Sequence, residues 1–237
     1  MPRINTVKKA RKDQGTCRGC GREIKAGDGY KWIKFRYGGK VKKCSSCNFR
    51  SSELTSSDKL SRLYAAQENA HDRLDGWDRE DPDEIQSLLE DTAQEIREVG
   101  EEYQESADAI REHFETSDTA DECEEKAQEI EGWADEVEGA DVPEWDDEEV
   151  RDEVLTSVQG DMIGDGEAVE CPTCQDAPSS ECEICHGFGI VKGPDFDGDD
   201  FPASVEEKFK AAISEKRSEW ADEVVSAVES VIDECPV

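Results

Sequence analysis

Eight of the ten cysteines form four CxxC pairs, and these pairs are grouped in twos. In the first group 23 residues separate the two pairs, and in the second group seven residues do. The groups consist of Cys17, Cys20, Cys44 and Cys47, and of Cys171, Cys174, Cys182 and Cys185. A CxxC turn directs two thiolates at one point, so two such turns complete a tetrahedral four-sulfur site of the structural zinc type. The sequence therefore predicts two zinc ions per chain, with these eight cysteines as metal ligands.

Disulfides or free thiols are the alternative to metal at these cysteines. Ten cysteines would suggest disulfides in a small secreted chain. The basic N-terminal stretch MPRINTVKKARKDQG is, however, not followed by the apolar segment of a signal peptide. Apolar runs are also too short for a transmembrane helix, so no membrane association is expected. We therefore expect a cytoplasmic protein, in which paired CxxC motifs favour metal binding.

The segment between the first two cysteine pairs has the pattern of a zinc ribbon, a β-hairpin type of zinc finger. YKWIKFRY is rich in aromatic and β-branched residues, Gly38-Gly39 is predicted as a two-residue turn, and KVKKC returns to the second pair. We predict a basic zinc ribbon over residues 17–57, preceded by a basic flexible arm over residues 1–16. Because the ribbon has almost no core, metal is expected to supply about 10 kcal/mol of its folding free energy.

The stretch CRGCGREIKAGDGYKWIKFRYGGKVKKCSSC resembles the zinc ribbons of small uncharacterised proteins of tailed viruses, haloarchaeal ones included, and of bacteria. The resemblance covers roughly residues 15–57. It implies a zinc-binding module and no particular activity. In a viral protein, the expected compartment would be the cytoplasm of the host.

The second cysteine group contains CEICHGFG, which resembles the CxxCxGxG element of the cysteine-rich region of DnaJ-type chaperones. The matching positions are Cys182, Cys185, Gly187 and Gly189. The first half departs from the pattern, because residues 175–178 replace the expected glycines. The resemblance covers about twenty residues and implies a single zinc knuckle. Chaperone activity is not implied, since the chain lacks the His-Pro-Asp triplet of a J-domain.

Charge is distributed very unevenly along the chain. The formal net charge is −33, yet 15 of the 28 lysines and arginines lie in the first fifty residues, beside three acidic ones. The acidic remainder repels itself at ordinary ionic strength and is screened near molar salt. Such a composition is similar to that of halophilic archaeal proteins. The alternative is a mesophilic protein with an acidic, solvated body.

Apolar residues recur at steps of three and four along the middle of the chain, in coiled-coil-like seams. The seams run from Leu60 to Trp77, from Ile85 to Phe114 and from Ala120 to Val137, and a shorter helix is predicted over Trp145–Val158. The breaks between these segments are short, so we predict an antiparallel hairpin or three-helix bundle. Together they form an acidic helical body over residues 58–158.

The remaining chain is predicted to hold a zinc knuckle with loops over residues 159–203 and an amphipathic helix over residues 204–237, capped by Ser204. The predicted fold class is therefore mainly α with small β. In chain order it comprises an N-terminal zinc ribbon, an antiparallel helical hairpin or bundle, a zinc knuckle and a C-terminal helix.

The ribbon carries the residues that we expect to bind nucleic acid. Alternation along a strand places cations and aromatic rings on one face, as in proteins that stack bases and contact phosphates. The candidates are Tyr30, Trp32, Lys34, Arg36, Lys40, Lys42 and Lys43. Two alternatives remain. The aromatic rings could form a miniature core covered by lysine stems, or the module could dock on an acidic protein surface.

No catalytic motif is recognised in the sequence. Glu68 and His71 have the Glu-x-x-His spacing of di-iron bundles, but the second such motif is missing. Complete four-thiolate sites are structural rather than catalytic. We therefore expect a non-enzymatic zinc-binding protein that acts on nucleic acid or in regulation through its ribbon. The alternative is a structural or assembly adaptor, which makes protein–protein contacts or self-associates through its acidic helices.

Overall fold

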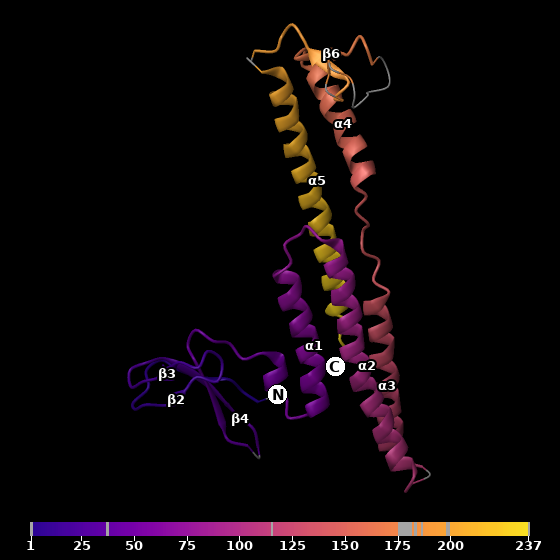
Figure 1. Ribbon diagram of the computed structural model, residues 1–237. Helices are drawn as coiled ribbons and strands as arrows, with labels where there is room; N and C mark the ends of the chain where they lie inside the picture. Colours follow the sequence, from indigo (N-terminus) through magenta and orange to yellow (C-terminus); the bar gives the residue numbers. More distant parts are fainter. Residues whose placement is uncertain are drawn as a thin grey trace. The chain divides into compact units, whose positions relative to one another are not determined.

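Figure 1 shows the computed structural model, which describes residues 2–36, 38–114, 116–174, 182, 184–185, 187–197 and 200–236. Within these residues the chain is mainly helical with small antiparallel sheets, so the predicted fold class of mainly α with small β is confirmed. The chain folds into two compact units. Unit 1 comprises residues 1–78, 83–140 and 227–237, and unit 2 comprises residues 79–82 and 141–226. The helical body expected over residues 58–158 is thus divided between the units.

Unit 1 begins with two small antiparallel sheets that form the ribbon. The larger sheet has the order β1-β4-β5, with β1 at Asn5–Val7, β4 at Tyr30–Lys34 and β5 at Lys40–Cys44. The smaller sheet pairs β2 (Gly15–Thr16) with β3 (Glu23–Ile24). The aromatic and β-branched residues of β4 therefore form the central strand, as their strand propensity favours.

Two expectations for the ribbon are wrong. Residues 1–16 are not a flexible arm throughout, because β1 pairs with β4 and β2 pairs with β3. The pairing of β1 satisfies backbone groups along an edge of β4 that would otherwise be exposed. Gly38-Gly39 is not a two-residue turn either. The last cross-strand pair is Lys34 with Lys40, so residues 35–39 connect the strands.

Three long helices follow the ribbon in unit 1, and Figure 1 shows them side by side. A short 3-10 helix, η1 (Ser51–Leu54), leads into α1 (Asp58–Asp75), α2 (Pro82–Arg111) and α3 (Asp118–Glu138). The Ser57 side chain accepts a hydrogen bond from the backbone N–H of Leu60 and so caps α1. These helices agree with the seams predicted from the sequence.

Ion pairs between the helices show that neighbours run antiparallel. Between two neighbouring helices, the earlier residue of the first pairs with the later residue of the second, and the later residue of the first pairs with the earlier residue of the second. The pairs are Arg62–Glu98 and Arg73–Asp91 between α1 and α2, and Arg97–Asp135 and Arg111–Asp121 between α2 and α3, at 2.9–3.1 Å. These pairs are largely solvent-exposed and therefore contribute little to stability. The order of pairing thus indicates direction more than stability.

The core of unit 1 lies between these helices and the end of α5 (Phe201–Ile232). Fully buried members include Leu63, Leu89, Ile96, Val99, Ile130, Val137, Val228 and Ile232. The indole N–H of Trp133 donates to the Val231 carbonyl at 2.8 Å, and the Gln67 amide donates to the Ile232 carbonyl at 3.2 Å. The chain's last turns are therefore anchored on α1 and α3.

Unit 2 contains α4 (Asp147–Gly164), a hairpin of β6 (Ala168–Glu170) and β7 (Ile190–Lys192), and most of α5. Its core is apolar and consists of Val154, Val158, Met162, Ala168, Ile190, Phe201 and Val205. The predicted short helix is thus longer than expected and ends at Gly164.

The predicted cap at Ser204 is wrong, because α5 begins at Phe201. The Asp200 carboxylate accepts a hydrogen bond from the Ala203 backbone N–H at 3.2 Å, as an N-cap does. Among the described helices, none combines the length and the apolar composition that a membrane span requires.

A buried ion pair joins the ribbon to η1. Lys43 is 6% exposed, and its ammonium lies 2.5 Å from the Glu53 carboxylate and 2.9 Å from the Asn48 carbonyl. Removing one partner of a buried pair leaves an uncompensated charge. We expect Glu53→Gln to lower the free energy of unfolding by about 2 kcal/mol, below the cost for a fully buried pair because Glu53 is partly exposed.

Urea denaturation followed by tryptophan fluorescence measures this change. The matched control is Glu95→Gln, at an exposed position of α2. Equal stability of the two variants would show that the Lys43–Glu53 pair does not stabilise the junction.

Candidate metal centres and the ribbon surface

The four sulfur atoms of the first cysteine group converge within 4.8 Å of one another. The Sγ atoms of Cys20 and Cys44 are 3.7 Å apart, and those of Cys44 and Cys47 are 3.5 Å apart. A tetrahedron with Zn–S bonds of about 2.3 Å has edges of about 3.8 Å, whereas a disulfide bond measures about 2.0 Å. These separations fit a metal ion at the centre and exclude disulfides between these pairs.

Local backbone geometry brings these four sulfurs together. Cys17 follows β2 and Cys44 ends β5, and the Cys44 backbone N–H donates to the Cys17 sulfur at 3.1 Å. A Cβ at Gly19 would lie 3.1 Å from the Cys47 sulfur, so a larger residue here would crowd this ligand. Gly21 adopts a φ of +71°, which favours glycine. The glycines of CRGCG therefore permit the close approach of the two CxxC turns.

The thiols of the first cluster differ in pKa. Burial acts to raise the pKa of Cys17, but backbone hydrogen bonds from Cys20, Cys44 and Gly19 outweigh it and lower this pKa to about 6. Hydrogen bonds with the sulfurs of Cys44 and Cys20 raise the pKa of Cys47 to about 12. Four thiolates cannot share so small a space without a cation. A divalent metal removes this conflict, because its ligands bind in the deprotonated form.

The first cluster also contains the small core of its module. Cys17, Ile24 and Cys44 are buried together, with Tyr30 and Cys47 packed against them. Tyr30, one of the residues predicted to bind nucleic acid, is partly buried and packs against this core. Its role in binding stays a prediction.

The second cysteine group forms a similar cluster in unit 2. Its four sulfurs also lie within 4.8 Å of one another, with Cys171 and Cys182 at 3.9 Å and Cys174 and Cys185 at 3.4 Å. Backbone hydrogen bonds from Cys185 and Ile184 lower the pKa of Cys182 to about 6. The donor set and spacing are again compatible with a zinc ion.

The glycines of CEICHGFG have a direct structural role at this second cluster. Gly187 and Gly189 have φ values of +90° and +68°, which side chains with a Cβ rarely adopt. The Gly189 carbonyl accepts a hydrogen bond from the Cys171 backbone N–H at 2.8 Å and so ties the two halves together. Residues 175–178, where the sequence departs from the chaperone pattern, lie outside the described residues.

Strand register separates the basic residues of the ribbon into two faces. Trp32 pairs with Lys42 and Lys34 pairs with Lys40, so these four side chains share one face. We call Trp32, Lys34, Lys40 and Lys42 the basic face. The Lys40 ammonium lies 4.1 Å from the centre of the Trp32 ring, and the Lys42 ammonium donates to the Gln14 carbonyl at 3.0 Å. Arg36 follows β4 and is exposed.

Lys43 does not belong to the basic face, which corrects its predicted role. It pairs with Lys31 across the strands and therefore lies on the opposite side of the sheet from Lys42. There it is buried and pairs with Glu53. Its positive charge is neutralised inside the fold and is withdrawn from any ligand. The alternation along β5 indicated this split, since adjacent residues of a strand face opposite ways.

The Glu68–His71 pair makes structural contacts. The Glu68 carboxylate accepts a hydrogen bond from the Ser52 hydroxyl at 2.6 Å, and His71 Nε2 lies 3.1 Å from the Asp233 carboxylate. One residue therefore joins α1 to η1, and the other joins α1 to the end of the chain. Sequence reasoning did not identify the ring of Tyr64, which lines a cavity beside the ribbon.

Removing one sulfur should empty one cluster and leave the other intact. We expect native mass spectrometry to find two zinc ions on the unmodified chain and one on Cys44→Ala, because three remaining ligands bind far more weakly. The control Cys123→Ala should retain two, since Cys123 lies on α3 outside both clusters. Two zinc ions on Cys44→Ala would contradict the assignment of this ligand.

No family model, curated protein or solved structure matches this chain. The resemblances to viral zinc ribbons and to the DnaJ-type region therefore stay predictions that depend on the quoted motifs. The two four-cysteine clusters, in contrast, depend on the geometry described above.

Proposed function

We propose that this chain is a non-enzymatic zinc protein that binds single-stranded nucleic acid through the basic face of its ribbon. The observation that carries the proposal is Trp32, which lies opposite Lys42 and under the Lys40 ammonium on one side of a sheet that ends at the first cysteine cluster. Stacking of a base on an aromatic ring contributes about 1–3 kcal/mol and requires no particular sequence. A base would stack on the ring face opposite the Lys40 ammonium, and Lys34 and Lys40 on the same side of the sheet could contact its phosphates.

The acidic residues near the ribbon support this proposal, because the fold uses them internally. The Asp13 carboxylate accepts a hydrogen bond from the Ala26 backbone N–H at 2.8 Å, and the Asp28 carboxylate accepts one from Lys25 N–H at 2.9 Å. Neither carboxylate pairs with the lysines of the basic face in a contact described here. Lys43 and Arg50 pair with Glu53 and Asp72, and the remaining excess of positive charge in the first fifty residues can attract a polyanion.

Charge outside the ribbon supports a confined binding surface. The rest of the chain carries most of the 61 acidic residues and repels phosphates. A nucleic acid would therefore be attracted to the ribbon and repelled by the helices. Such an arrangement favours contact with a short single strand over wrapping of a long duplex.

The alternative function, an adaptor that self-associates through the apolar seams of its helices, has weaker support. The apolar seams that were expected to mediate self-association are buried within unit 1, with Leu63, Ile96 and Ile130 at most 1% exposed. A partner would therefore meet acidic helix surfaces instead of these seams. We accordingly favour the ribbon as the working surface and treat zinc as the ion that shapes it.

Two substitutions on the basic face should separate stacking from charge. We expect Trp32→Ala to weaken binding to a fluorescein-labelled 12-nucleotide oligothymidine about tenfold in fluorescence anisotropy, because base stacking is lost. Lys40→Gln should reduce the slope of log affinity against log salt by about 1, as expected for one lost phosphate contact.

Zinc content measured on the same samples distinguishes a lost surface from a lost fold. The control is Lys210→Gln, at an exposed position of α5 in unit 2, which should bind as the unmodified protein does. Unchanged affinity of Trp32→Ala with two zinc ions bound would contradict the proposal.

A further inference from the structure

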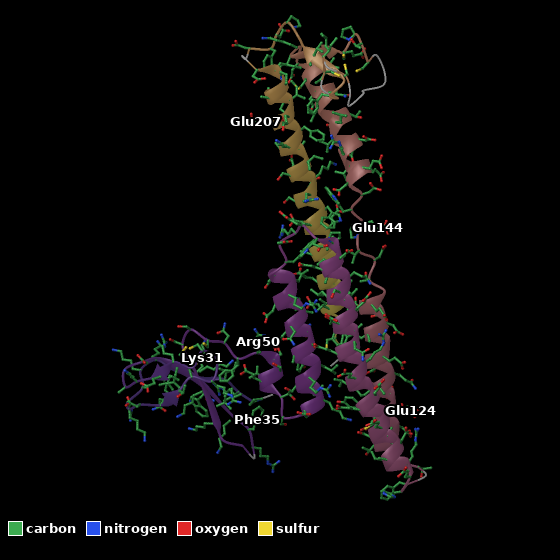
Figure 2. All side chains as sticks on the ribbon, viewed as in Figure 1. Lys31, Phe35, Arg50, Glu124, Glu144 and Glu207 are labelled. Atoms are coloured by element: carbon green, nitrogen blue, oxygen red, sulfur yellow. The ribbon has the colours of Figure 1, made fainter. Side chains whose placement is uncertain are left out.

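A cavity of about 330 Å³ lies between the loop end of the ribbon and the start of α1. Both sides of it belong to unit 1. Phe35, labelled in Figure 2, stands where β4 ends and the connection to β5 begins. The lining residues are Pro2, Lys34, Phe35, Arg36, Leu54, Thr55, Ser56, Leu60 and Tyr64. The cavity therefore combines residues of the ribbon, of α1 and of the segment between them.

The lining has an apolar and aromatic part beside a cationic part. Phe35, Leu60 and Tyr64 are half-buried, and Leu60 and Tyr64 lie one turn apart on the same side of α1. Lys34 and Arg36 contribute positive charge from the ribbon. Such a combination suits a ligand with a flat apolar group and a phosphate.

The sign of the charge distinguishes this cavity in so acidic a chain. A cavity between α2 and α3 has two carboxylates and one cation in its lining, and one between α4 and α5 has three carboxylates and one cation. These residues are Glu101, Glu131 and Arg97 in the first, and Asp161, Asp165, Glu215 and Lys208 in the second. In contrast, the lining beside the ribbon contains no carboxylate among the described residues. An anionic ligand would be repelled at the first two cavities and attracted at the third.

Lys34 connects this cavity to the basic face. It belongs to both, because it pairs with Lys40 across the strands and also lines the cavity. A nucleic-acid strand with one base stacked on Trp32 would therefore continue along the β-sheet toward the cavity. The two aromatic sites would be joined by a lysine that can contact the phosphate between them.

We propose that this cavity receives one unpaired nucleobase of the bound strand, held against Phe35 and Tyr64, with its phosphate at Lys34. This inference deepens the proposed function and depends on it. The volume lies at the small end of the range for ligand pockets, so it suits a single base. A base inside a duplex could not enter without leaving its stack. The site thus selects single strands.

The experiment compares two labelled strands with the same number of phosphates, using the full-length, zinc-loaded protein. One strand is a 12-nucleotide oligothymidine and the other is a 12-unit abasic strand, and anisotropy measures both affinities. Phe35→Leu and Tyr64→Leu each remove a ring but keep an apolar side chain. We expect each to weaken oligothymidine binding about tenfold and to leave abasic binding unchanged.

The matched control is Phe114→Leu, at an exposed aromatic residue of unit 1 outside the cavity, which should bind both strands as the unmodified protein does. Zinc content and thermal melting confirm folding, and two independent ring variants keep the test valid if one fails to fold.

The outcomes separate the cavity from the proposed function. Suppose that Phe35→Leu and Tyr64→Leu bind oligothymidine normally, whereas Trp32→Ala binds it more weakly. This result would contradict the base site in the cavity and would still support binding by the basic face. If the ring variants lost equal affinity for oligothymidine and for the abasic strand, the base site would also be contradicted, because the lost affinity would not depend on a base. No binding of either strand by the unmodified protein would overturn both proposals.

Discussion

The ribbon depends on four sulfur atoms that meet at one point. Apart from the sulfurs themselves, the small core around the first cluster contains little more than Ile24 and the partly buried Tyr30, and the ribbon also buries Ile33 and Ala10. So little apolar surface cannot offset the conformational entropy of ordering some fifty residues, at about 1–2 kcal/mol each for the backbone alone. A metal held by thiolates can supply the missing free energy, on the order of 10 kcal/mol. The position of β5, and hence of the basic face, follows from Cys44 as one of these ligands.

Electrostatics imposes the second constraint on the molecule. The helices of unit 1 bury apolar seams and expose carboxylates, some of which pair with arginines of neighbouring helices. The ribbon has the opposite charge, and its internal acids are engaged by backbone N–H groups. Lys43, one of the candidate cations, is buried and is neutralised by the partly exposed carboxylate of Glu53. The chain thus carries its excess positive charge on the ribbon and its excess negative charge on the helices, which would restrict a polyanion to the ribbon.

Local patterns predicted the helices and the two sulfur clusters well, because both depend on short-range spacing. Seams of three and four residues marked α1, α2 and α3, and CxxC pairs marked the sulfur clusters. The strand β1 was missed, because three residues become a strand only through pairing with β4. Lys43 was misassigned, since its burial depends on η1 packing against the sheet. The cavity at Tyr64 could not be predicted, because it forms between elements distant in the sequence.

The most direct test of the central claim follows backbone amides by heteronuclear NMR while zinc is removed with a chelator. We expect metal binding to supply the folding free energy of the ribbon, whereas the helices of unit 1 have an apolar core of their own. We therefore expect the amide resonances of residues 15–47 to collapse to random-coil positions, while those of α2 and α3 stay dispersed. Dispersed resonances for residues 15–47 in metal-free protein would contradict this account.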